Sequence, residues 1–269
     1  MPTAIAIGNM FGGNASGGIG GGTPIPPTPS GGFKMTVNTA LTGTSANDEF
    51  KLTLYSGDTY SFDIDWGDGT TDTITAWNQA ELLHTYSVAG IYLLEITGTC
   101  GNIKYSGSGD ILKITDISNW GGSNLNIGGG GAAFAFRGYA GTITATDSPT
   151  ISGDLVGYFY QSTFSSGCSN WNTANAASFQ FFLLSNSNWN DDISSWNVGS
   201  ATTFSNAFGS APVSTANYDA LLIAWSAQTV NVGVSLTMGS TQYTLGGAAE
   251  AGRATLVTNG WSITDGGGI

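Results

Sequence analysis

A phrase of about 25 residues recurs in the middle of this 269-residue chain. Asp-Ile-Ser-Ser-Trp-Asn at 192–197 has counterparts in Asp-Ile-Ser-Asn-Trp at 116–120 and Gly-Cys-Ser-Asn-Trp-Asn at 167–172. Recurrence at a short fixed period is typical of proteins built from stacked units, each of which buries its apolar side chains against its neighbours. The repeat therefore predicts a stack of turns in the middle of the protein.

The spacing of large apolar residues supports this prediction. Trp171 and Trp196 are 25 residues apart, and a phenylalanine follows each of them after eight residues. Trp120 lies 51 residues before Trp171, which leaves room for a degenerate turn near Thr146. We therefore expect four turns over 113–212. Their repeated core residues are Ile117, Trp120, Ile143, Cys168, Trp171, Phe179, Ile193, Trp196, Phe204 and Phe208. The same alignment matches Tyr139 with Phe164 and Trp189, and Tyr158 with Leu183 and Phe208.

Two features of the repeat bear on its chemistry. Cys168 falls where other turns have isoleucine, so we interpret it as a small buried hydrophobe, with a reactive thiol as the alternative. Between the core positions the turns carry Ser, Thr, Asn and Gly, which satisfy tight turns through local hydrogen bonds. This composition favours short strands over helices.

The segment 189–208 closely resembles the repeat of BspA-like surface proteins of Bacteroidetes and mycoplasmas. It reads Trp-Asn-Asp-Asp-Ile-Ser-Ser-Trp-Asn-Val-Gly-Ser-Ala-Thr-Thr-Phe-Ser-Asn-Ala-Phe. The family repeat has methionine where this chain has Phe204 and Ala207. The resemblance covers about 100 residues, is weak before residue 165, and implies a leucine-rich-repeat-like solenoid with binding or structural roles. Such a fold does not by itself identify a ligand.

Residues 33–107 show alternating apolar and polar residues between turn signals, as expected for a β-sandwich. Two motifs in this segment, Asp-Trp-Gly-Asp-Gly-Thr at 65–70 and His-Thr-Tyr-Ser-Val-Ala-Gly-Ile-Tyr at 84–92, together resemble the polycystic-kidney-disease (PKD) domain. That resemblance implies an immunoglobulin-like sandwich that serves as a spacer or adhesion module without catalysis.

Residues 213–269 leave the repeat pattern. Apolar residues at 216–228 and 248–257 have helical spacing, and Gly-Trp-Ser-Ile-Thr-Asp-Gly at 260–266 predicts a strand. The predicted fold is therefore mainly β: an immunoglobulin-like sandwich (33–107), a short leucine-rich-repeat-like β-solenoid (108–212) and a small α/β cap (213–269). Before these, residues 1–32 are rich in Gly and Pro and are expected to form a flexible anchoring leader and linker.

Charge and hydropathy limit the partners. The net charge is −12, and the six basic residues are scattered, so nucleic acid is not expected as a partner. The chain has no run of 18 apolar residues, so we expect no membrane insertion. Its start lacks the basic and apolar regions of a secretory signal, so export by the ordinary route is not expected if Met1 is the native start. Cys100 and Cys168 fall in different predicted domains, so no disulfide framework is expected.

The candidates for catalysis are few. His84 is the sole histidine and lies in the PKD-like motif, where a packing or turn role is expected. Without a second histidine or a Gly-x-Ser-x-Gly motif, a hydrolase triad has no base. Asp191 and Asp192 suggest the paired carboxylates of a glycosidase, but the repeat alignment explains Asp192 as a turn residue. The sequence therefore predicts a protein that is not an enzyme.

The sequence is compatible with two kinds of ligand site. Asp63 and Asp65 share one face of a predicted strand and Asp68 follows closely, which makes them calcium candidates; the alternative is a hairpin turn beside a solvated sheet face. No other cofactor is expected, because the glycine run 128–131 lacks the context of a phosphate loop. The eight tryptophans and ten tyrosines allow sugar binding by exposed rings.

Surface-type modules without an export signal are consistent with a phage virion protein, which is assembled inside the host and released by lysis. We therefore expect a structural protein on the particle exterior, as a head decoration, head fibre or tail fibre. Residues 1–32 would contact other virion proteins, and several copies would stabilise the shell or bind host surface glycans with avidity. The alternatives are a bacterial cell-surface adhesin and a carbohydrate-binding accessory module of an enzyme.

Overall fold

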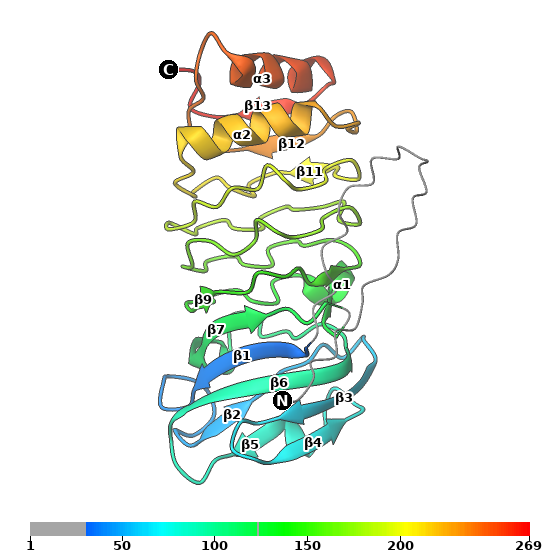
Figure 1. The fold of residues 1–269 in the computed structure, drawn as a ribbon, viewed down its shortest axis with the longest axis vertical. Coiled ribbons are helices and arrows are strands. Elements are labelled where there is room, and N and C mark those ends of the chain that lie inside the picture. The colour runs from blue at the N-terminus through cyan, green and yellow to red at the C-terminus, as the bar shows by residue number, and fades with distance from the viewer. Residues whose placement is uncertain (1–30, 123) are drawn as a thin grey trace, which may run out of the picture.

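The computed structural model describes residues 31–122 and 124–269, so the expected leader at 1–32 lies almost wholly outside the described residues. The molecule is elongated and mainly β. A unit of sheets forms one end, turns stack above it, and two helices lie near the other end (Figure 1). One hydrophobic core runs through both parts, from Phe33 in the first strand to Trp261 near the C-terminus.

The largest sheet has six strands in the order β4-β3-β6-β1-β7-β9. Its strands are β1 (Phe33–Asn38), β3 (Tyr60–Asp65), β4 (Thr71–Ile74), β6 (Ile91–Cys100), β7 (Ile114–Asn119) and β9 (Thr142–Ile143). All neighbours are antiparallel except β7 and β9. In β3 every second residue is buried, because successive side chains of a strand point to opposite faces.

A smaller antiparallel pair, β2 (Glu49–Lys51) with β5 (Leu83–Thr85), accompanies this sheet. Short 3-10 helices precede β5 and β7, at Ala80–Leu82 (η1) and Ile111–Lys113 (η2). Phe50 at the centre of β2 is fully buried, as is Ile64 of β3. Apolar residues of both sheets thus belong to one core.

The large sheet continues across the expected domain boundary at 107/108. Strand β7 pairs with β1 on one side and with β9 on the other, where Ile117 lies opposite Ile143. The first turn of the stack is therefore an integral part of the sheet. The two regions therefore share a sheet and a hydrophobic core.

The stack contains little regular strand, although its turns lie regularly above one another. Its strands are β8 (Asn126–Ile127), β10 (Thr150–Ile151) and β11 (Thr203–Phe204), and a short helix, α1 (Gly129–Ala132), occupies most of the glycine run. Strands β8 and β10 pair in parallel. Elsewhere series of backbone hydrogen bonds at every second residue link the turns. One series runs to the next turn from the amides of Leu155, Gly157, Phe159 and Gln161, at 2.8–2.9 Å.

These lateral bonds correct one match of the sequence alignment. Phe136 N donates to Tyr158 O, Phe159 N to Phe182 O, and Leu183 N to Ala207 O. Each donor directly follows the acceptor of the preceding bond, so Phe159, and not Tyr158, occupies the place of Leu183 and Phe208. The alignment of Tyr158 was wrong by one residue because the spacing of the turns changes along this line.

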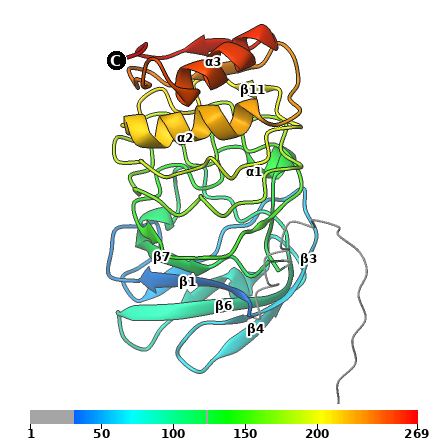
Figure 2. The same ribbon diagram turned by 45° about the horizontal axis from the view of Figure 1, so that its top comes forward.

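The C-terminal segment extends the stack and does more than cover its last turn. It contains α2 (Thr215–Ser226), β12 (Ser235–Thr237), α3 (Ala248–Thr258) and β13 (Ser262–Thr264). Both helices and β13 match the sequence-based expectations, whereas β12 was not predicted. Strands β11, β12 and β13 form a parallel sheet, in which Phe204, Leu236 and Ile263 are in register. Helices α2 and α3 lie one above the other on this end (Figure 2).

Candidate functional site

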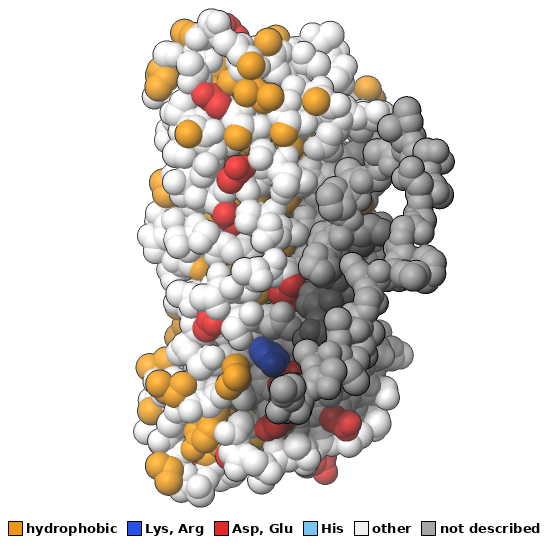
Figure 3. Space-filling model, in the orientation of Figure 1, with side chains coloured by type: hydrophobic (Ala, Val, Ile, Leu, Met, Phe, Trp, Pro, Cys, Tyr) orange, Lys and Arg blue, Asp and Glu red, His pale blue; other side chains and the backbone are white. Residues whose placement is uncertain are grey.

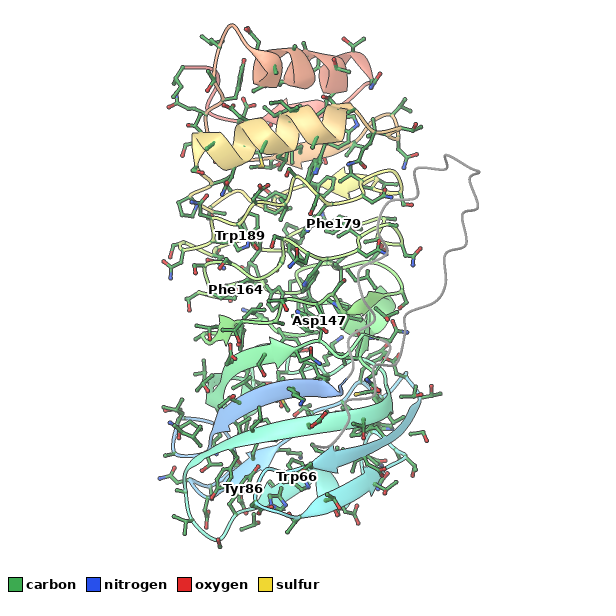
Figure 4. The ribbon with its side chains drawn as sticks, viewed as in Figure 1. Trp66, Tyr86, Asp147, Phe164, Phe179 and Trp189 are labelled. Carbon is green, nitrogen blue, oxygen red and sulfur yellow. The ribbon has the colours of Figure 1, made fainter. Side chains whose placement is uncertain are left out.

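The ten repeat residues expected in the core lie in the interior of the stack. The most exposed of them, Ile143, has only 7% of its surface accessible. Figure 4 shows Phe179 inside the stack, together with Phe164 and Trp189. Trp120 and Trp171 belong to different turns, yet their ring centroids are 5.2 Å apart, since the intervening turn carries no tryptophan. These side chains form a packed interior and no ligand site.

Both cysteines are free and buried. Burial is the main cause that raises the pKa of the Cys168 thiol well above its ordinary value, and the Asp191 carboxylate adds to this effect. Burial raises the pKa of Cys100 as well. Since the thiolate is the nucleophilic form, neither residue is suited to reactive-thiol chemistry.

Asp191, the first glycosidase candidate, binds the backbone of the neighbouring turn. Its Oδ2 accepts hydrogen bonds from the backbone amides of residues 167–169 at 2.7–3.0 Å. Asp192 Oδ1 accepts from Ser194 N at 2.9 Å, as in an Asx turn. The two carboxylates thus have separate structural partners within the stack.

Two further aspartates connect turns in the same way, and sequence reasoning missed both. Asp147 accepts from the backbone amides of Trp120 and Gly121, each at 2.8 Å. Asp154 Oδ1 accepts from Ser178 N at 2.8 Å. Figure 4 places Asp147 in the lower part of the stack. The sequence feature that could have identified these two links is a single aspartate in a polar segment between two core positions.

Asparagines add a second set of links between turns. Their side-chain amides donate to backbone carbonyls about one repeat away in sequence. These bonds run from Asn170 to Thr146, Asn175 to Ile151, Asn186 to Phe164, and Asn188 to Thr163, at 2.8–3.1 Å. They satisfy carbonyl groups that a regular sheet would pair with backbone amides. The polar residues of the repeat are therefore mainly structural.

The PKD-like motif forms a clasp between the β3–β4 hairpin and β5. The His84 ring stacks on Trp66 with centroids 4.7 Å apart, and its Nε2 lies 2.9 Å from Asp68 Oδ2. Tyr86 donates its hydroxyl to Trp66 O at 3.1 Å, while Trp66 Nε1 donates to Asp72. Figure 4 shows Trp66 and Tyr86 in this part of the molecule. The sole histidine is thus held in a packing role.

The structure does not bring the three calcium candidates together. Asp63 accepts from the Thr73 hydroxyl and Asp65 from a backbone amide two residues on. Asp68 accepts from Thr70 and contacts His84. Its slight burial alone would raise its pKa, but these hydrogen bonds outweigh that effect and lower it to about 2. Across residues 31–122 and 124–269, no group of three or more acidic, His or Cys side chains is placed to hold a metal ion.

Asp110 and Lys113 are buried at the junction of the two regions, and both hold the loop that precedes β2. Lys113 Nζ donates to the backbone carbonyls of Ser45, Ala46 and Glu49 at 2.6–3.3 Å. Asp110 accepts from the backbone amides of Thr44 and Ser45 in this loop and of Lys51 in β2. Burial alone would raise the pKa of Asp110, but the hydrogen bonds outweigh it and lower the pKa.

Few tryptophans are exposed. Seven of the eight are buried, and only Trp77 is exposed, at 46% of its surface. The described surface has a hollow of about 390 Å³ lined by Thr42–Thr44, Gly107–Gly109, Ile111, Leu112 and Gly138. Another, of about 260 Å³, lies beside Asp58 and Asn102. Both lie where the sheet region meets the stack. No helix in the described part of the chain is long and apolar enough to cross a membrane.

The fold and its polar network define a mainly β protein built around a stack of linked turns. Over residues 146–240 the chain is similar to a family described as "Mycoplasma protein of unknown function, DUF285". The similarity covers the stack from its second turn to strand β12 and leaves out the sheet region. Comparisons with curated proteins and with solved structures found no match.

Proposed function

We propose that this protein is a non-enzymatic display protein, in which a leucine-rich-repeat-like solenoid is carried outward by an immunoglobulin-like sandwich. The use of the polar side chains supports this proposal most directly. Carboxylates that would serve a hydrolase instead bind backbone amides between turns, as Asp191 does. The thiols are buried, and the one histidine is stacked on Trp66.

Features of the two regions support the finer classification. The PKD-like residues form the clasp between the two sheets, as expected if they stabilise a sandwich. Strand β12 pairs in parallel with β11, and β13 pairs in parallel with β12. This agrees with a solenoid whose last turns contain helices in place of loops. Such repeats present extended surfaces for binding.

The proposed location is the exterior of a phage particle or of a cell, with residues 1–32 as the attachment. The virion location follows from the sequence reasoning. The family match favours the alternative of a bacterial cell-surface adhesin, because that family is described as one of mycoplasma proteins. Several copies would act together, so weak single contacts with host glycans would add up to firm attachment.

Exposed apolar residues favour an oligomer. Ile91 and Leu93 of β6 have 69% and 51% of their surfaces accessible, and Val88 precedes them with 66%. Figure 3 shows hydrophobic side chains gathered over the sheet end of the molecule. A patch of this kind on a protein surface is typical of an interaction site.

Immunogold labelling of purified virions and of intact source cells would test the proposal. We expect antibodies against the stack to label the exterior of one of the two. Absence of label from both would contradict display, whereas label on only one would assign the location. Turnover of a polysaccharide that is abolished by Asp191→Asn or Asp192→Asn would contradict the non-enzymatic assignment.

A further inference from the structure

Strand β13 forms an open edge of the sheet β11-β12-β13. Within the described residues it is the outermost strand and pairs on one side only, with β12. Ser262 N donates to Val234 O at 2.8 Å. Thr264 O accepts from Met238 N, also at 2.8 Å. Because successive residues of a strand direct their backbone groups to opposite sides, the N–H and C=O of Ile263 point away from β12. The edge therefore offers a donor and an acceptor to another strand.

The apolar interior is only partly covered at this end of the stack. Phe204, Leu236 and Ile263 are in register in the three strands. Phe204 and Leu236 are fully buried, whereas Ile263 is half-buried, since a strand lies on only one side of it. Figure 1 shows β13 and α3 at the end of the molecule opposite the sheet region. The terminal unit of a soluble repeat protein usually presents a polar outer face, which this end lacks.

Helix α3 has an apolar residue where α2 makes its contact with the next helix. Trp225 and Leu256 are the last buried residues of α2 and α3. Ser226 and Val257, which follow them, therefore occupy corresponding positions. Ser226 lies against α3, because a methyl group added to Gly252 would be 3.0 Å from its Oγ. Val257 has 45% of its surface accessible, so the face of α3 that corresponds to the covered face of α2 is open.

The open edge carries neither charge nor proline, which usually protect an exposed strand. Asp265, which follows β13, is almost fully buried in an ion pair with Arg253, with 2.7 Å between Oδ2 and Nε. The edge strand β4 is different, because it contains Asp72, and Asp63 and Asp65 lie on the adjacent β3. Two copies that met at β4 would bring these acids together, and like charges on paired strands are destabilising. A second copy is therefore accommodated better at β13.

We propose that β13 is the docking edge for a second copy of this chain, which adds its own β13 in antiparallel orientation about a two-fold axis. With the axis at Ile263, the N–H of each Ile263 donates to the C=O of the other. Ser262 then lies opposite Thr264 of the second copy, and such hydroxyl pairs are favourable across strands. Both Ile263 side chains lie on one face of the joined sheet, so the second copy extends the apolar interior. This contact goes beyond the proposed display function and does not depend on the surface that carries the protein.

Sedimentation velocity of the full chain would test this contact. We expect the wild type to form a dimer at concentrations up to about 100 µM. Ile263→Pro removes the outward N–H but no hydrogen bond to β12, and proline is tolerated at such an edge position. It should weaken dimerisation by about tenfold. Val257→Lys places a charge on the open face of α3 and should weaken it as well, while circular dichroism confirms that both variants are folded.

Ile223→Lys is the matched control. Ile223 has 44% of its surface accessible, almost the same as Val257, but it lies on α2. We expect this variant to dimerise like the wild type. A wild type that stays monomeric at about 100 µM would overturn the inference, as would equal dimerisation by Val257→Lys and the wild type. Hydrogen exchange gives a second measurement, because the Ile263 amide should exchange more slowly as the dimer forms. Unchanged exchange at this amide in a dimeric sample would overturn the pairing of the two edges.

Discussion

The sheet region and the stack are held together by different interactions. In the sheet region β1 and β6 pair over six consecutive residues, and alternating side chains bury Met35 and Val37. In the stack a strand such as β11 has only two residues. There, Asp and Asn side chains bind the backbone groups that a continuous strand would pair. Backbone pairing sets the register in the sheet region, whereas in the stack polar side chains add further links to the backbone hydrogen bonds between turns.

Because of this difference, aspartates have different structural roles in the two regions. Asp63 and Asp65 are exposed on the outer face of β3, where they contact only local groups. Asp147 and Asp191 bind the backbone of another turn, so their loss would separate structural units. The same residue type is therefore predicted to be tolerant of substitution in one region and sensitive in the other.

The largest effect is expected for the apolar interior of the stack. Trp196→Ala removes a fully buried ring and its hydrogen bond to Cys168 O, so it should lower the free energy of unfolding by about 3–5 kcal/mol. Trp77→Ala, at an exposed position, should change it by about 0.5 kcal/mol or less. Urea unfolding of the two variants measures both values. Similar losses would contradict the assignment of Trp196 to the core.

The next effect tests the junction between the two regions. Lys113→Met should lower the free energy of unfolding by about 3 kcal/mol, because the partly buried carbonyls of Ala46 and Glu49 lose a charged donor. Lys51→Met, in which an exposed side chain is changed, is the control. If the sheet region and the stack then unfold in two separate transitions, the junction is what couples them. A variant as stable as the wild type would show that Lys113 is dispensable.

A smaller effect is expected for one link between turns. Asp191→Ala should lower the free energy of unfolding by about 2 kcal/mol, since three backbone amides lose a charged acceptor. Hydrogen exchange should accelerate most at the amides of residues 167–169. Asp192→Ala, which loses a single bond to Ser194, serves as the comparison. Equal effects of the two substitutions would contradict the linking role of Asp191.

The smallest effect is expected on the stability of the fold at acid pH. Burial alone would raise the pKa values of Asp110 and Asp265, but hydrogen bonds outweigh burial and lower both. Asp265 owes this mainly to Arg253 and then to Tyr218. Such carboxylates stabilise the fold fully above their unfolded pKa of about 3.9, and this contribution is lost as the pH falls through their folded pKa values. Asp110→Asn and Asp265→Asn should therefore flatten the acid side of the stability profile, as followed by circular dichroism.

Much of the architecture was predictable because it depends on local patterns. The 25-residue period predicted which residues would face the interior, and Cys168 is buried like the isoleucines it replaces. Helices α2 and α3 followed from apolar spacing. The sequence alignment placed Tyr158 one residue out of register, at a point where the turn length changes. Strand β12 was missed because three residues are too few to show a hydrophobic pattern. The part played by β7 in the sheet was also missed, since pairing with β1 depends on residues about 80 positions away.

The sequence by itself determined the periodic interior, the abundance of turn residues and the scarcity of catalytic groups. These are properties of short stretches of chain, in which side-chain type and spacing set the preferred conformation. The tertiary structure alone decided what the polar residues do. Asp191 became a link between turns, and Arg137 came to bond Gln161 of the next turn, because their partners lie in other turns. The stacking of the turns determines which residues become partners, and the residue pattern within one turn does not predict that stacking.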